Sequence, residues 1–234
     1  MKYLLLWLEG PLQSWGADSR FDLRQTRPFP TQSGIFGMLL AASGDSGPQE
    51  QLLAEMADAP LSVISFVQEK RTLVDFHMVG NGYDEKDPWQ TLNIPRKPDG
   101  GKAVGGGAKR TYREYLQDCC FAVIIGLPDH LTEKFADALQ NPVYDLYLGR
   151  KCCVPSTMIF QGVFANENEA LTHLKEKLIP GRSTEKRPLK PHQLIKTVPY
   201  GEDPDAVLIN DVPVRFGNNR LYRDRWVSIQ DFAE

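Results

Sequence analysis

Apolar positions occur in runs of different period along the chain, and each run predicts an element. Residues 3–9 are almost continuously apolar, which is typical of a central strand that is covered on both faces. The apolar positions from Ile35 onward predict a helix that ends near Ser43, with Thr31 or Ser33 as its N-cap. The chain is therefore expected to begin with a buried strand and a buried helix.

The next runs complete the pattern of an α+β domain. An amphipathic segment at 50–57 predicts a second helix, and 61–67 and 72–76 predict two strands. The order strand, helix, helix, strand, strand is the opening half of a ferredoxin-like or RRM-like unit. The second half is expected from strands at 111–116, 119–127 and 158–164 and from a helix that ends at Leu139.

Residues 80–110 interrupt this order. They are rich in Gly and Pro and show no hydrophobic period, and a segment of this kind inside a compact domain is usually functional or disordered. We interpret residues 80–110 as a projecting arm, inserted into an RRM-like domain that spans residues 1–165.

The remaining residues, 166–234, predict a smaller β-rich C-terminal region. It opens with an amphipathic helix at 167–178, and the Pro-rich, basic segment from Pro180 to His192 predicts a linker or mobile loop. Three short strands are expected at 193–198, 206–209 and 225–232. The predicted fold class is therefore α+β, with an RRM/ferredoxin-like N-terminal domain, a projecting arm and this smaller region.

Charge limits the kind of nucleic-acid contact that the chain can make. Its 234 residues carry 27 Lys and Arg against 30 Asp and Glu, a net charge of −3. Proteins that bind nucleic acid without specificity usually show a basic excess, so a nucleic-acid site here would be a local patch. No apolar run approaches the ~20 residues of a membrane span, and we expect a cytoplasmic protein that does not contact a membrane.

The four cysteines form two adjacent pairs, Cys119 with Cys120 and Cys152 with Cys153. Neighbouring strand residues point to opposite faces, so such a pair does not place both sulfurs on one metal ion without unusual backbone geometry. We interpret the cysteines as buried, reduced thiols, and expect no metal site and no cofactor.

The first candidate RNA-binding residues lie in the loop and helix start within residues 10–39. A Gly-Pro turn leads into a Gln-Ser-Trp segment that we expect to be exposed. Tryptophan can stack on a base, arginine can bind phosphate, and a helix N-terminus offers free amides to an anion. A packed tryptophan, a helix cap and solvated arginines are the alternative interpretation. The candidates are Gln13, Ser14, Trp15, Arg20, Arg24, Arg27, Ser33 and Gly34.

A second set of candidates follows the arm and is the densest cluster of aromatic and cationic side chains. Stacking combined with phosphate charge is how single-stranded RNA is held, although an edge strand with solvated charges is the alternative. The cluster contains Lys109, Arg110, Tyr112, Arg113 and Tyr115, and the loop at 144–151 adds Arg150 and Lys151. We interpret a third basic cluster as a solvated hairpin rather than a binding surface; it consists of Arg215, Arg220, Arg223 and Arg225.

Four motifs occur in the same order as in a known family. They are Gly10-Pro-Leu-Gln-Ser-Trp-Gly16, Phe29-Pro-Thr-Gln-Ser-Gly34, Thr111-Tyr-Arg-Glu-Tyr-Leu116 and Tyr147-Leu-Gly-Arg150. With these motifs the chain resembles the CasD family, whose members are subunits of the type I-E CRISPR Cascade complex and belong to the RAMP superfamily of RNA-binding proteins. The resemblance covers residues 10–150, and the last third matches only in approximate length.

The resemblance implies a non-catalytic subunit that binds the 5′ handle of the mature CRISPR RNA and caps the backbone filament of an antiviral surveillance complex. It implies contacts with the neighbouring backbone subunit and with the large subunit, and contact with target DNA only within the assembled complex. The arm would reach the RNA and the adjacent subunit.

Catalysis finds little support in the sequence. The histidines occur singly, and His77, at the mouth of the arm, is the only one that we consider for RNA cleavage. In some relatives of the family the equivalent subunit cuts the CRISPR transcript with a Tyr, Lys and His set, so a metal-independent endoribonuclease is the main alternative. A free-standing RNA-binding module and a small-molecule enzyme on the same fold are the two others.

Overall fold

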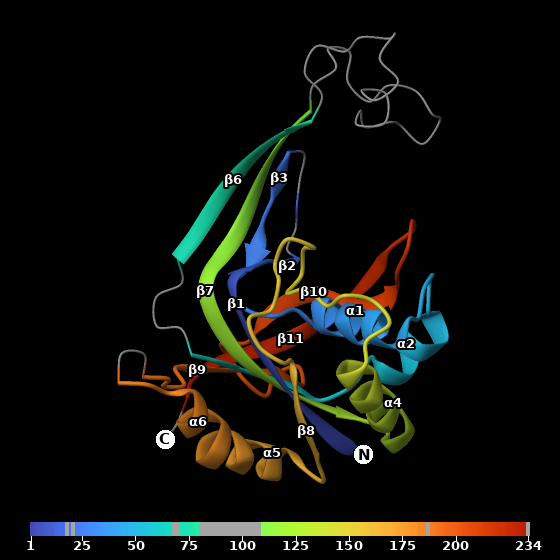
Figure 1. Ribbon diagram of the computed structural model, residues 1–234. Helices are drawn as coiled ribbons and strands as arrows, with labels where there is room; N and C mark the ends of the chain where they lie inside the picture. Colours follow the sequence, from blue (N-terminus) through green and yellow to red (C-terminus); the bar gives the residue numbers. More distant parts are fainter. Residues whose placement is uncertain (17–18, 20–21, 67–70, 80–108, 186–187, 233–234) are drawn as a thin grey trace.

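One large antiparallel sheet organises the molecule. The computed structural model describes residues 1–16, 19, 22–66, 71–79, 109–185 and 188–232. Its main strands run in the order β10-β11-β9-β5-β7-β1-β8 (Figure 1). They are β1 (Lys2–Gln13), β5 (Leu61–Ser65), β7 (Lys109–Leu127), β8 (Phe160–Phe164), β9 (Gln193–Val198), β10 (Val207–Arg215) and β11 (Leu221–Asp231).

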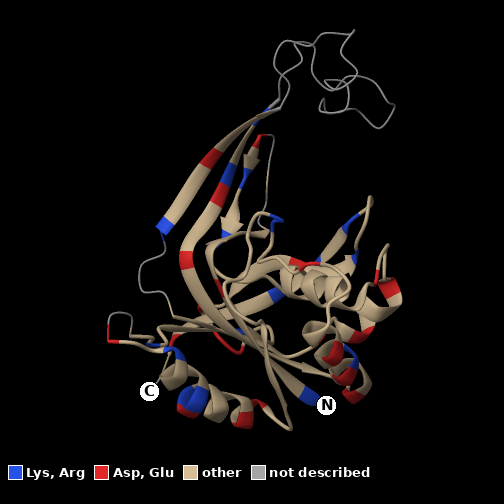
Figure 2. Ribbon diagram, viewed as in Figure 1, with Lys and Arg blue, Asp and Glu red and all other residues tan. Residues whose placement is uncertain are grey.

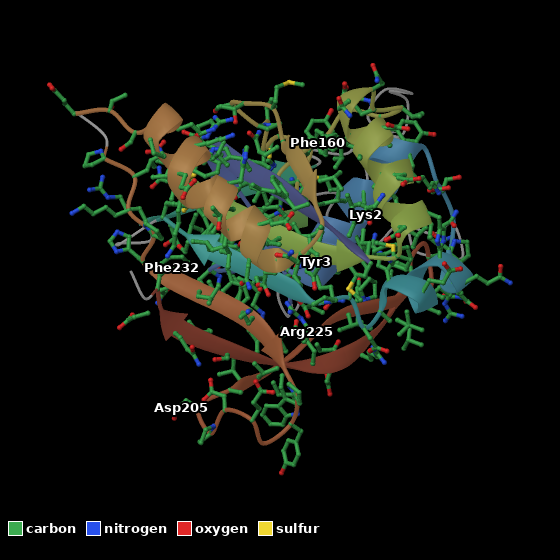
Figure 3. All side chains as sticks on the ribbon, turned by 90° about the horizontal axis from the view of Figure 1, so that it is seen from below. Lys2, Tyr3, Phe160, Asp205, Arg225 and Phe232 are labelled. Carbon is green, nitrogen blue, oxygen red and sulfur yellow. The ribbon has the colours of Figure 1, made fainter. Side chains whose placement is uncertain are left out.

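Helices cover both faces of this sheet. Helices α1 (Gln32–Ser43), α2 (Glu50–Met56) and α4 (Asp129–Gln140) lie over one face. Figure 3 shows that α5 (Glu167–His173), η1 (Leu174–Leu178) and α6 (Ile179–Arg182) form a continuous helical segment over the other face. No helix in the described part of the chain is long and apolar enough to cross a membrane.

The continuous apolar run at the start of the chain is explained by these two layers. Along β1, Leu4 and Leu6 point into the core beneath α1 and α4, whereas Leu5 and Trp7 point into the core beneath α5 and η1. All four side chains are fully buried. The prediction of a strand covered on both faces is confirmed, and the mixed α and β fold class is confirmed at that level.

The helix after this strand begins and ends as its sequence indicates. Thr31 is the N-cap, and its hydroxyl oxygen accepts a hydrogen bond from the amide of Gly34 at 3.2 Å. Gly44 ends the helix with a φ of 75°, in the left-handed region that favours glycine. Helix α1 is therefore fixed at both ends.

Strand β7 is longer than the two strands predicted for it. Its first half pairs with β6 (Arg71–Val79), and its second half pairs with β5. On the other edge of the first half, β3 (Leu23–Arg24) pairs with Tyr112 and Arg113 in parallel. We call β6, β3 and residues 109–117 of β7 the ribbon, and Figure 1 shows it rising away from the rest of the molecule.

The predicted arm begins where the ribbon ends. Val79 and Lys109 are register partners, so the two ends of the predicted arm are held next to each other. The arm itself lies almost entirely within residues 80–108, outside the described residues. Its projection is therefore still a prediction.

The C-terminal strands join the same sheet as the N-terminal ones. Strand β9 has the predicted bounds and pairs with β5, which continues the sheet through β11 to β10. Strand β10 continues to Arg215 instead of ending at 209, because the buried Asp211 is paired with Arg225, and β11 begins at Leu221 rather than at 225. The proposed boundary near residue 165 separates no independent sheet, and the division into two domains stays a prediction.

The helix predicted to end before Pro180 instead continues to Arg182. Proline is tolerated in the first turn of a helix, where its missing N–H has no intrahelical partner to lose. The π-helical turn η1 ends at Leu178, and α6 begins directly after it as a new α-helical turn. Pro180 therefore lies in the first turn of α6.

Candidate nucleic-acid interface

The Gln-Ser-Trp segment is buried, not exposed as predicted. Gln13 and Trp15 have no exposed surface and Ser14 has 5%. The Gln13 amide donates to the carbonyl oxygens of Leu8 (3.1 Å) and Cys119 (2.7 Å), and its own oxygen accepts from the Trp15 indole N–H at 3.1 Å. The expected exposure is therefore wrong, because these side chains hold the backbone together, and RNA contact by Gln13, Ser14 and Trp15 stays a prediction.

A glycine brings the loop at 144–153 against this segment. Gly149 has a φ of 98°, and a Cβ at this position would overlap the carbonyl oxygen of Ser14. The amide of Ser14 donates to the carbonyl oxygen of Leu148 at 3.0 Å. Only glycine satisfies both the backbone angle and the close approach, so Gly149 determines where the next residue, Arg150, is held.

Arg150 is half-buried and joins three chain segments. Its guanidinium donates to the carbonyl oxygens of Glu114 (2.9 Å) and Arg24 (2.7 Å), and its Cζ lies 4.7 Å from the centre of the Tyr115 ring. Tyr115 is only 2% exposed, so its ring is covered in this conformation and stacking of RNA on it stays a prediction. Burial raises the pKa of the Tyr115 hydroxyl, as does its hydrogen bond with Cys152.

A cavity of about 800 Å³ lies beside Arg150. Its lining comes from the 14–34 segment, from the 149–150 turn and from strands β10 and β11. Figure 2 shows Lys and Arg positions in the ribbon and in the β10–β11 region. The lining residues with cationic side chains are Arg24, Arg27, Arg150 and Arg220.

The start of helix α1 forms part of the cavity wall through Thr31, Ser33 and Gly34. Two of its first amides already have partners, since the Gln32 amide donates to the Asp211 carboxylate at 2.8 Å and the Gly34 amide to Thr31. A helix start can bind an anion through unpaired amides. Fewer unpaired amides are therefore left for an anion at Ser33 and Gly34 than predicted, because Asp211 and Thr31 already accept hydrogen bonds from two of them.

The cluster predicted after the arm is divided between the two faces of the ribbon. Strand alternation puts Arg113 on the face that carries Tyr115, and Arg24, its register partner on β3, on that same face. Tyr112 lies on the opposite face, where its ring packs against Phe76 at 5.4 Å between ring centres. Arg24, Arg113 and the cavity therefore share one side, and Tyr112 does not face them.

The other predicted residues are only partly placed. Arg110 and Lys151 are exposed. Arg20 and the side chain of Lys109 lie outside the described residues.

The sequence interpretation missed the contribution of the C-terminal hairpin to this cavity. Arg220 comes from the cluster that was interpreted as a solvated hairpin, and β10 and β11 add further lining residues. Aromatic and cationic residues near the end of a hairpin were the available signal, but nothing in the sequence shows that the hairpin faces α1. The additional lining residues are Asn210, Phe216 and Tyr222.

Three of the four cysteines are buried as predicted. Cys119 and Cys120 point into the two different cores, but Cys152 is exposed, because it lies in the turn after Gly149. Burial raises the pKa of the Cys153 thiol to about 12. Among the described residues, no group of three or more His, Cys, Asp or Glu side chains is arranged to hold a metal ion.

Comparison with known proteins gives the family. A family profile described as "CRISPR-associated protein (Cas_Cas5)" matches residues 3–228. The Escherichia coli (strain K12) protein "CRISPR system Cascade subunit CasD" is 30% identical over 171 residues, which are 68% of this chain and 70% of that protein.

Two solved structures share the whole fold. One chain from a "CRISPR RNA-guided surveillance complex" aligns with a TM-score of 0.73 and 27% identity, over 98% of this chain and 89% of that chain. A second, "Crystal structure of Cas protein", aligns with a TM-score of 0.64 and 27% identity, over 98% and 94%. The resemblance found in the motifs is confirmed: the chain belongs to the Cas5 family of CRISPR-associated proteins.

Proposed function

We propose that the protein is a non-catalytic subunit of a type I-E Cascade surveillance complex and that it binds the 5′ handle of the mature CRISPR RNA. The observation that carries this proposal is the cavity with four arginines in its wall. A single RNA strand is held by cations along its backbone and by the surfaces that receive its bases. A local cationic cavity fits a chain whose net charge is −3.

The ribbon extends the proposed RNA path beyond the cavity. Arg24 lines the cavity and is the register partner of Arg113, so a strand of RNA that leaves the cavity meets Arg113 next. On the same face of the ribbon, Asp75 lies beside Arg113 as its register partner on β6, and His77 lies further along. The RNA would run from the cavity along this face, toward the arm.

The proposed RRM-like unit is supported by strand order. Strands β8, β1, β7 and β5 are neighbours in this order and are all antiparallel, which is the arrangement of a βαββαβ unit with β1 and β7 in the centre.

The proposal also includes the capping of the backbone filament, with contacts to the neighbouring backbone subunit and to the large subunit.

Co-purification of RNA tests this function. The tagged protein would be co-expressed with a repeat-containing CRISPR transcript and the neighbouring cas proteins, and the RNA that co-purifies would be sequenced. We expect one RNA species with a common 5′ end. Heterogeneous RNA, or no RNA, would contradict handle binding.

A charge-matched pair of variants assigns the RNA to the cavity. The double variant Arg24→Gln/Arg27→Gln removes two cations from the cavity wall, whereas Lys177→Gln/Lys190→Gln removes two exposed cations elsewhere. Only the first double variant is expected to lose the RNA. Equal loss in both would indicate non-specific attraction.

RNA cleavage is the second candidate function, and one contact favours it. His77 Nε2 contacts the Asp75 carboxylate on the face of the ribbon that carries Arg113. A histidine oriented by a carboxylate can act as a general base. Cleavage would require that His77 converge with a nearby Tyr or Lys; Tyr112 lies on the other face, and the side chain of Lys109 lies outside the described residues. Loss of transcript cleavage in His77→Ala, with the wild-type protein active alone, would favour the enzyme.

A further inference from the structure

The β10–β11 hairpin forms one wall of the cavity. Phe216, Arg220 and Tyr222 line the cavity from its turn and from the start of β11, opposite Arg24 and Arg27 of the N-terminal segment. These two walls are almost 200 residues apart in the sequence. Strand β9 pairs with β5 and with β11, and so joins the hairpin to the sheet that carries the N-terminal segment.

The hairpin is anchored firmly to helix α1. Arg225 is 8% exposed, and its guanidinium donates to both carboxylate oxygens of Asp211, at 2.6 and 2.9 Å. The same carboxylate accepts from the Gln32 amide at 2.8 Å, and Arg225 also donates to the Thr197 hydroxyl at 2.6 Å. A bidentate, hydrogen-bonded pair of this kind fixes the direction of both partners, so the wall of the cavity is preorganised.

The four arginines of the hairpin differ in how they are neutralised. Arg215 pairs with Glu50, Arg223 with Asp58 and Arg225 with Asp211. Arg220 is exposed and donates only to the Gly217 carbonyl oxygen, and it has no carboxylate partner among the described residues. The arginine that lines the cavity is thus the one whose charge is left for another anion.

Tyr222 offers an aromatic surface at the same place. It is half-buried and lines the cavity, and its hydroxyl forms no hydrogen bond within the described part of the chain. Aromatic rings hold unstacked bases of single-stranded RNA, while nearby guanidinium groups hold the phosphates. A volume of about 800 Å³ is in the range of pockets that enclose small organic ligands.

We propose that the hairpin binds one unpaired, unstacked nucleotide of the RNA, with its base on Tyr222 and its phosphate beside Arg220. This inference rests on the proposed function and assigns the C-terminal strands a direct part in it. The nucleotide would lie between two walls, one cationic and N-terminal, the other aromatic and C-terminal. RNA bound only along the ribbon would not need the hairpin.

Variants at adjacent positions test the two contacts. The probe is a synthetic, 5′-fluorescein RNA with the sequence of the co-purified species, titrated against the full chain by anisotropy. Tyr222→Leu is expected to weaken binding about tenfold, and Tyr222→Phe, which keeps the ring, to bind at least about five times more tightly than Tyr222→Leu. Equal loss in both would overturn stacking on the ring.

The arginine contact has a matched control on the same hairpin. Arg220→Gln and Arg223→Gln remove the same charge, but only Arg220 lines the cavity. Arg220→Gln is expected to reduce the dependence of log affinity on log salt by about 0.7, the change for one phosphate contact on a single strand. The same reduction in Arg223→Gln, or no reduction in Arg220→Gln, would overturn the contact.

Crosslinking with ultraviolet light separates failure of this inference from failure of the proposed function. The purified complex would be irradiated, and the RNA-linked peptides identified by mass spectrometry. An adduct within residues 216–222 supports the inference. Adducts confined to the ribbon would overturn it and leave RNA binding intact, whereas a protein that co-purifies with no RNA would overturn both.

Discussion

The two halves of strand β7 show how one strand can serve stability at one end and binding at the other. Residues 119–127 lie between β1 and β5, and their side chains alternate into two buried cores. Residues 109–117, the outer half, pair with β6 and, at Tyr112 and Arg113, with β3; residues 111–114 are half-buried, and of the described side chains only Tyr115 and Leu116 are buried. Residues 119–127, the inner half, are fixed on both edges and both faces, so they anchor the outer half where it leaves the core.

The largest expected effect on stability comes from a substitution in the inner half of β7. Phe121 is fully buried beneath the helices, and Phe121→Ala would remove its ring and leave a cavity. We expect the free energy of unfolding to fall by about 3–5 kcal/mol, measured by urea denaturation.

Phe76, opposite the outer half, is the matched residue. It is 51% exposed and packs mainly against Tyr112, so Phe76→Ala is expected to cost no more than about 1.5 kcal/mol. Similar losses in Phe121→Ala and Phe76→Ala would break the distinction between the two halves.

The junction between the halves and the cavity is expected to give the next largest effect. Gly149→Ala would force a Cβ into the Ser14 carbonyl at a left-handed φ, which should cost about 1–3 kcal/mol and displace Arg150. Gly181→Ala is the control, because a Cβ there meets no atom within 4 Å and Gly181 does not line the cavity. Urea denaturation of both variants, followed by RNA titration, would detect the difference; a well-folded Gly149→Ala that binds RNA normally would contradict it.

A smaller effect on stability, with a clear effect on RNA, is expected from the outer half. Arg113→Gln removes a half-buried cation from the ribbon face that carries Arg24. Unfolding free energy should change by no more than about 0.5 kcal/mol, while the salt slope of RNA binding falls by about 0.7. A lower free energy of unfolding without a change in the salt slope would show that Arg113 serves stability, as the inner half does, and not RNA binding.

The smallest effect concerns acid and belongs to the helical layer, far from the ribbon. Burial alone would raise the pKa of the Asp45 carboxyl, but hydrogen bonds from Lys134 and Ser43 outweigh it and lower the pKa. A lowered folded pKa stabilises the protein above the ordinary pKa of Asp, and this contribution is lost as pH falls through the folded value. At pH 7, Asp45→Asn should therefore lower the free energy of unfolding by less than about 1 kcal/mol, seen as a lower urea midpoint. Near pH 2 the substitution should have almost no effect. If the two proteins differed in stability as much near pH 2 as at pH 7, the ion pair of Asp45 with Lys134 would not be the cause.

Strand and helix positions were predictable from the sequence where the hydrophobic period was strong. The apolar run of β1 and the Thr31 cap of α1 gave correct elements. Strand β10 was underestimated because Asp211 is charged, and its bidentate contact with Arg225 of β11 is what stabilises it in a buried position. A charge pair between two strands has no signature in either strand alone.

The candidate site was predictable in part. The sequence identifies Arg24, Arg27 and Arg150 as candidates in two separate stretches, and the structure brings them to one cavity. Trp15 could not be assigned, since an indole that donates to Gln13 in a core has the same sequence as one that stacks on a base. Alternation along β7 already separates Tyr112 from Arg113, so their division between two faces was available from the sequence.

The exposed Cys152 has a practical consequence. The other three thiols are buried, and the raised pKa of Cys153 keeps that thiol protonated and unreactive near neutral pH. A maleimide dye added to the unaltered protein would therefore attach at one position, in the turn beside Tyr115 and Arg150. Its emission would report, without any engineered cysteine, when a ligand enters or leaves the neighbouring space.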